Sequence, residues 1–149
     1  MKNFMMAVAA ALALAPAAVA QTQSQMIVGR WTCSADTPDG FISAQMNYGA
    51  DGVAHSTMIM SFGEPGALGQ VIMEITSSWR APGDGTLREK VTDLDVLRFT
   101  MNGEENDPDA LESQGEDMMR DELQSGSLQL TKNSLTMIDE EGVRTSCIR

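Results

Sequence analysis

Most residue types that carry catalytic or metal chemistry are scarce in this sequence. Its 149 residues include two cysteines, one histidine, two tryptophans and one tyrosine. It contains no Cys-x-x-Cys pair, no Gly-x-Ser-x-Gly turn, no His-Glu-x-x-His pair and no phosphate-binding glycine loop. These absences weigh against the common redox, hydrolytic, zinc-dependent and nucleotide-dependent enzymes. We therefore expect no catalytic activity, no cofactor and no metal.

Basic residues are also few. Ten Lys and Arg stand against 21 Asp and Glu, a formal charge of −11. Without Lys2, nine basic residues remain against the same 21 acidic ones, and the charge becomes −12. Phosphate backbones repel such a chain, so nucleic acid is not an expected partner. A basic protein or a cation is more compatible, although solubility alone also explains the charge.

Long apolar runs are confined to the N-terminus. Lys2 precedes an apolar run over residues 4–15, and small residues up to Ala20 follow Pro16. The run is shorter than the roughly 20 residues of a membrane-spanning helix and fits the apolar core of a secretory signal. The sequence predicts a cleaved signal peptide at 1–20 and export to the periplasm or the exterior. The alternative is an uncleaved anchor. The mature chain, 21–149, is expected to form one domain without a membrane span.

The expected export decides which role the two cysteines are expected to have. In an oxidising compartment a cysteine pair more often forms a structural disulfide than a redox or metal site. Cys33 and Cys147 are 114 positions apart, so a bond between them would close nearly the whole mature domain. We predict this disulfide; two free buried thiols are the alternative.

Alternation of apolar and polar residues dominates the rest of the chain, which is typical of half-buried strands. Runs of this kind, separated by glycine-rich turns, cover 41–48, 53–62, 71–80, 87–101, 127–131, 135–139 and 143–148, with an interruption expected near 93–95. Eight or nine short strands with hairpin turns predict an all-β protein, an antiparallel up-and-down barrel. In such a barrel the first and last strands pair, which removes the edges of the sheet.

The cysteines also fix a register for that closing pair. Opposed residues in an antiparallel pair have a constant index sum. If Cys33 opposes Cys147, the sum is 180, and Trp31 then opposes Arg149. We therefore expect the terminal guanidinium to pack on the indole as a cation–π pair.

One acidic segment departs from the alternation. Residues 104–122 hold nine acidic residues and one basic residue, Arg120. We expect residues 101–125 to form an acidic loop with one short helix near 116–124, interrupted before it by Gly115. Asp107, Asp109 and Glu112 offer oxygen ligands for a hard cation, but their spacing is not that of an EF-hand. A solvated charged loop is the default interpretation.

Gly29 and Trp31 form a Gly-x-Trp step in the first expected strand. This step matches the first-strand signature of the lipocalins, and the sequence resembles the small bacterial lipocalin-like domains in particular. The steps at 48–52 (Tyr-Gly-Ala-Asp-Gly), 79–87 and 134–142 are similar to later parts of the bacterial pattern, and the resemblance covers 27–100 and 126–149. It implies a lipocalin-like barrel in which an arginine of the last strand, Arg149 or Arg144, packs on Trp31. Such barrels serve many functions, so the fold does not settle this one.

The predicted inner faces collect adaptable apolar side chains. The candidate ligand cavity is lined by Met46, Met58, Met60, Met73, Trp79 and Glu89. Methionines adjust their shape to varied apolar ligands. An eight-stranded barrel is just wide enough for one small ligand, although a core filled by side chains is the alternative. Glu89 would orient a ligand or lie at a wet barrel mouth, whereas His55, the only histidine, is expected on the outer face.

We therefore expect an exported lipocalin-like binding protein for a small apolar or amphipathic ligand. The alternative is an interaction or inhibitor module that binds a basic protein through its acidic surface.

Overall fold

The computed structural model describes residues 21–119 and 123–149, so the predicted signal peptide lies outside the described residues. Within these described residues, nine strands and two helices follow one another: α1 (Gln23–Ile27), β1 (Gly29–Thr37), β2 (Gly40–Tyr48), β3 (Val53–Glu64), β4 (Ala67–Arg80), β5 (Thr86–Met101), β6 (Glu104–Asn106), α2 (Pro108–Met119), β7 (Leu123–Leu130), β8 (Ser134–Asp139) and β9 (Arg144–Ile148). The strand order is β4-β3-β2-β1-β9-β8-β7-β5, and β4 pairs with β5. The predicted antiparallel up-and-down barrel is confirmed, with eight strands in the ring and β6 as an addition. None of the helices described is long and apolar enough to cross a membrane.

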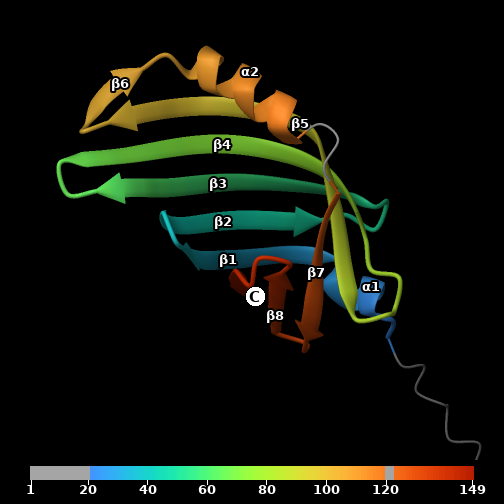
Figure 1. The fold of residues 1–149 in the computed structure, drawn as a ribbon. Coiled ribbons are helices and arrows are strands. Elements are labelled where there is room, and N and C mark those ends of the chain that lie inside the picture. The colour runs from blue at the N-terminus through green and yellow to red at the C-terminus, as the bar shows by residue number, and fades with distance from the viewer. Residues whose placement is uncertain (1–20, 120–122) are drawn as a thin grey trace, which may run out of the picture.

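The barrel is much deeper on one side than on the other. Strands β1–β5 are long, and they project well beyond the short strands β7–β9 (Figure 1). β7 pairs with β5 only along residues 86–90, and β9 pairs with β1 only along 32–35. We call the part completed by β7–β9 the closed end. Beyond it, β5 continues to Met101 without β7 beside it.

The closing seam has the expected register. Cys33 pairs with Cys147, the index sum is 180, and the two sulfur atoms are 2.07 Å apart in a disulfide. The guanidinium carbon of Arg149 lies 4.1 Å from the centre of the Trp31 ring. Arg149, rather than Arg144, therefore occupies the position that the resemblance assigns to an arginine of the last strand.

A short helix, α1, plugs the closed end, and the sequence did not reveal it. Its last residue, Ile27, is fully buried, and its carbonyl accepts a 2.7 Å hydrogen bond from Nε1 of Trp31. Arg149 donates to the backbone carbonyls of Met26 and Val28 at 2.8 and 3.0 Å. The seam and the plug are thus held together by Trp31 and Arg149.

The expected interruption near residues 93–95 is wrong, because β5 runs unbroken. Its pairing with β4 slips by one residue twice, between Ile72 and Met73 and between Thr76 and Ser77. Leu97, which falls in one slip, is 52% exposed on the outer side. Such bulges bend a strand and raise its twist. Here they accompany the change of neighbour on β5 from β7 to β6 and α2.

The helix of the acidic segment also differs from the expectation of residues 116–124. It begins at Pro108, and residues from Leu123 belong to β7. Asp107 caps the helix by accepting a 3.0 Å hydrogen bond from the backbone of Asp109. Gly115 lies inside the helix and does not interrupt it. A Cβ at this position would lie 2.7 Å from a methyl of Leu94, so only glycine fits here without a shift. Glycine lets α2 lie close against the sheet along β5 (Figure 1).

Candidate functional site

The inner face of β2–β5 is built from rows of residues that oppose one another across four strands. From the closed end outward, the rows are Tyr48–Ala54–Ser77–Val91, Met46–Ser56–Ile75–Leu94, Ala44–Met58–Met73–Val96 and Ile42–Met60–Val71–Phe99. All six predicted cavity residues face inward, since Trp79 and Glu89 form the next pair toward the closed end. The alternating sequence pattern therefore placed them on the correct face.

The closed end is a filled core. Trp31, Tyr48, Ile27, Leu87 and Leu135 are its largest fully buried side chains. Two of the predicted cavity residues belong to it, since Trp79 is buried there and Met46 packs against it. The closed end is therefore packed with side chains around Trp79, with Met46 at the border of this core.

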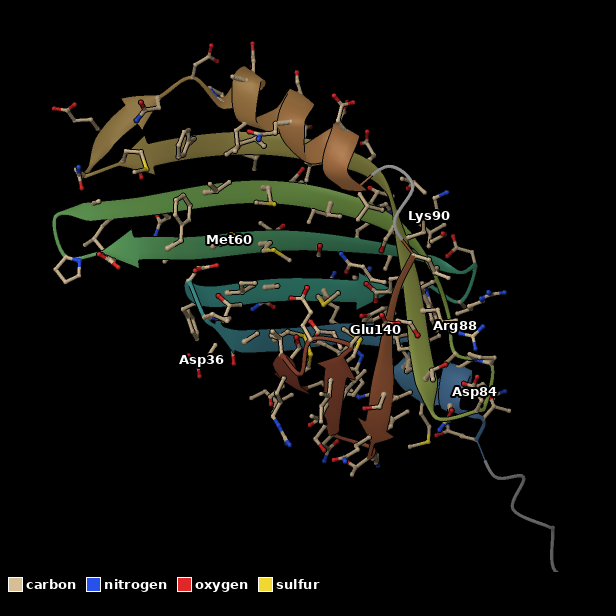
Figure 2. The ribbon with its side chains drawn as sticks, in the orientation of Figure 1. Asp36, Met60, Asp84, Arg88, Lys90 and Glu140 are labelled. Atoms are coloured by element: carbon tan, nitrogen blue, oxygen red, sulfur yellow. A yellow bond between two sulfur atoms is a disulfide. The ribbon has the colours of Figure 1, made fainter. Side chains whose placement is uncertain are left out.

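The inner face beyond the closed end is only partly covered. Val71, Met73, Leu94 and Val96 form a second apolar cluster, and Met58, Phe62, Ile75, Phe99 and Leu111 of α2 pack against it half-buried. Met60 is half-buried on β3 (Figure 2), and its row continues through Ile42 to Ala35, which pairs with the start of β9. We call this surface the upper inner face; it comprises Met58, Met60, Phe62, Val71, Met73, Leu94, Val96 and Phe99. Met58 packs against both clusters and so links it to the closed end.

Helix α2 covers the β5 side of the upper inner face. Leu111 packs on the second cluster, and Glu112 Oε2 accepts a 2.9 Å hydrogen bond from the backbone N–H of Val96. That N–H lies on the part of β5 that no longer pairs with β7. The carboxylate thus satisfies a sheet-edge donor that would otherwise need water.

A polar pair lies at the boundary between the two clusters. The hydroxyl of Tyr48 donates to Oε1 of Glu89 at 2.5 Å and lies 3.8 Å from the sulfur of Met46. Tyr48 is on β2 and Glu89 on β5, so the bond crosses over β3 and β4. The residues beneath it, Ala54 and Ser77, are small enough to leave room for the phenol ring.

The tryptophan beside this pair orients the ring but gives the carboxylate no donor. Trp79 meets the Tyr48 ring edge to face, with centroids 5.3 Å apart and planes at 79°. Its Nε1 donates instead to the carbonyl of Gly49 at 3.1 Å. Tyr48 is therefore the one hydrogen-bond partner of the Glu89 carboxylate within the described residues.

Burial perturbs both members of the pair. It raises the pKa of Glu89 above its ordinary value, an effect that the hydrogen bond from Tyr48 opposes. The pKa of Tyr48 is raised well above 10.0, first by burial and then by the charge of Glu89. Tyr48 is thus a neutral donor at physiological pH, held against an acid that ionises less readily than usual.

The raised pKa of Glu89 gives a pH-dependent expectation for stability. The folded protein keeps this proton to higher pH than the unfolded chain, so stability is lost as the pH rises from about 4.5 through the folded pKa. Glu89→Gln cannot ionise, and we expect its stability relative to the wild type to improve from pH 4 to pH 7. Urea unfolding at both pH values measures this, with Glu74→Gln on the outer face as the control for net charge. An equal difference at both pH values would contradict the assignment.

The other candidates are not brought into one site. His55 is exposed, with Nδ1 3.2 Å from Oγ1 of Thr76. Asp107 and Glu112 are engaged with backbone groups, and no group of three His, Cys, Asp or Glu suited to a metal occurs within the described residues. The acidic side chains of β6 and α2 are mostly exposed, with an ion pair between Glu105 and Arg98 at 3.1 Å. A basic protein partner for this surface stays a prediction.

Two shallow hollows lie away from the polar pair. One, of about 630 Å³, surrounds the outer ends of β1–β4 near Phe41, Phe62 and Leu68. The other, of about 430 Å³, lies across β2–β4 and includes His55 and Glu74 from the outer face. Both are open, and of the upper inner face they include only Phe62.

No protein-family model matches the chain, and a search of curated proteins finds no match to it.

Proposed function

We propose that the protein is an exported binding protein that holds a small apolar or amphipathic ligand on its upper inner face, between α2 and the long strands. One observation carries the proposal. Met58, Met60, Phe62 and Phe99 lie on the inner face yet stay half-buried, on the side of the barrel where β5 has parted from β7. Covering them with an apolar ligand would remove their remaining apolar surface from water, at about 25 cal/mol per Å².

The side chains of this surface suit a ligand that is bound by shape and apolar contact. Three of them are methionines, which adjust their rotamers and offer a polarizable sulfur. Phe62 lies over Gly69, where a Cβ would approach its ring to 2.5 Å, and the same site is 2.8 Å from the sulfur of Met101. Gly69 thus leaves room for the Phe62 ring to lie flat against β4 at the outer end of the surface. We do not propose catalysis.

Binding of N-phenyl-1-naphthylamine, a neutral apolar dye that fluoresces in apolar surroundings, tests the proposal. The wild type is expected to bind the dye saturably and to release it to an alkyl alcohol. Met60→Glu, which places a carboxylate on the surface, should weaken dye binding by about tenfold or more.

The same substitution at the neighbouring residue, Ile59→Glu, is the matched control. Ile59 points to the outer face and is 39% exposed, so Ile59→Glu adds the same charge next door without touching the upper inner face. It should leave the dissociation constant within about twofold, which is under half a kcal/mol. Equal losses in both variants, or no saturable binding by the wild type, would overturn the proposal.

A further inference from the structure

We infer that Glu89 and Tyr48 form the polar end of the ligand site, and that the ligand they select carries a primary ammonium group on an apolar chain. This inference rests on the proposed function and specifies the class of ligand. The decisive atom is the second carboxylate oxygen of Glu89, Oε2. Oε1 accepts from Tyr48, whereas Oε2 has no hydrogen-bond partner in the part of the chain that the structure describes.

The free oxygen keeps contact with solvent from inside the barrel. Within the described residues, Oε1 of Gln23 is the one fully buried side-chain oxygen or nitrogen without a partner, so Oε2 of Glu89 is not sealed off. Glu89 faces inward beside Trp79 and opposes Gln124, which is exposed near the start of β7. The carboxylate therefore lies where the ring of strands opens.

The pair lies directly beside the apolar surface. The row that contains Tyr48 is followed by the row that contains Ile75 and Leu94, and Leu94 belongs to the second cluster. Met46, close to the Tyr48 hydroxyl, is on that same next row. A ligand whose head meets Glu89 can therefore extend its chain over Leu94 and Met58 toward Phe99.

No cation of the described chain neutralises Glu89. The basic neighbours in the sequence, Arg88 and Lys90, alternate to the outer side of β5 (Figure 2). Arg88 is paired with Asp84 at 2.8 Å. A carboxylate that is desolvated without a positive partner is costly, and a ligand that supplies the charge and a donor removes that cost.

The geometry favours a compact cation with hydrogen atoms to donate. One carboxylate oxygen is open, and Tyr48 fixes the other, so the head group meets a single oriented acceptor. A primary ammonium is a small point charge with three donors, and one of them suffices here. A carboxylate head would be repelled by Glu89, and an alcohol would bring a donor without charge.

Competition with the bound dye separates these head groups. Dodecylamine hydrochloride, dodecanol and dodecanoate share one chain, and each is titrated below its micelle-forming concentration into the wild type, Glu89→Gln and Glu74→Gln. The wild type should prefer the ammonium to the alcohol by about tenfold, the usual scale of a charge-assisted hydrogen bond. Glu89→Gln should lose most of that preference. Glu74→Gln, which removes the same charge from the outer face, should keep it.

Quaternary ammonium provides a second measurement that needs only the wild type. Dodecyltrimethylammonium keeps the positive charge but has no N–H to donate, so it should bind several-fold more weakly than dodecylamine. Dye binding together with equal affinity for all head groups would overturn the inference while leaving the proposed function standing. Absence of any dye binding would overturn the proposed function itself. An equal loss of preference in Glu74→Gln would show that net charge, and not Glu89, makes the selection.

Discussion

Replacing Cys33 and Cys147 together with serine is expected to lower the free energy of unfolding by about 2–5 kcal/mol. The disulfide spans 114 positions and ties the first strand of the ring to the last. β9 has five residues and pairs with β1 only along residues 32–35, so few other contacts hold it to the first strand. Without the bond, the unfolded chain regains the freedom of a very long loop, and the seam can fray from β9.

Guanidinium unfolding of the oxidised protein and the double serine variant measures this difference. The wild type under a reducing agent serves as a control, because it has the same broken bond with the native cysteines. Amide hydrogen exchange should quicken first in β9 and the facing residues of β1. A loss below about 1 kcal/mol, or uniform faster exchange throughout the barrel, would contradict the role of the disulfide as the clasp of the seam.

Trp31→Ala is expected to cost about 3–5 kcal/mol, the usual range for deleting a buried large aromatic side chain. The indole is 1% exposed and packs in the closed-end core. The substitution also removes the donor to the carbonyl of Ile27 and the ring under Arg149. The same substitution therefore detaches α1 from β1 and leaves a cavity beneath it.

Trp31→Phe separates the two contributions. Phenylalanine fills most of the space but cannot donate to Ile27, so its cost should be smaller, about 1–3 kcal/mol. Denaturant unfolding followed by circular dichroism measures both variants. Equal costs would show that the hydrogen bond to α1 dominates, whereas a negligible cost in both would contradict the assignment of Trp31 as the centre of the closed end.

The regular part of this barrel could be predicted from the sequence because its strands alternate strictly. Ile42, Ala44 and Met46 on one strand, and Met73 and Ile75 on another, face inward as the two-residue period requires. The seam followed from the two cysteines, whose register carries Arg149 onto Trp31.

The missed parts depend on contacts that local sequence does not show. A bulge shifts the two-residue period by one, so β5 looked interrupted although it is continuous. Gly115 lowers helix propensity, yet its close approach to Leu94 makes it suited to α2. The helix start is signalled locally by Asp107 before Pro108.

The candidate site was predictable only in its parts. The alternation of inward and outward residues along each strand puts Tyr48 and Glu89 on the inner face. Their contact, however, crosses two intervening strands and depends on the small side chains of Ala54 and Ser77. The incomplete cover of the upper inner face depends on where β7 parts from β5, which no local pattern encodes. Tertiary geometry thus supplied the site, while the sequence supplied the side chains.

Methyl NMR of the protein labelled on its methionines tests the central claim most directly, because the chain has twelve methionines and several of them line the inner face. Titration with N-phenyl-1-naphthylamine should shift the methyl signals of Met58, Met60 and Met73 and give nuclear Overhauser contacts from the dye to Met60. Unchanged methyl signals of Met58, Met60 and Met73 at saturating dye would contradict a ligand site on the upper inner face.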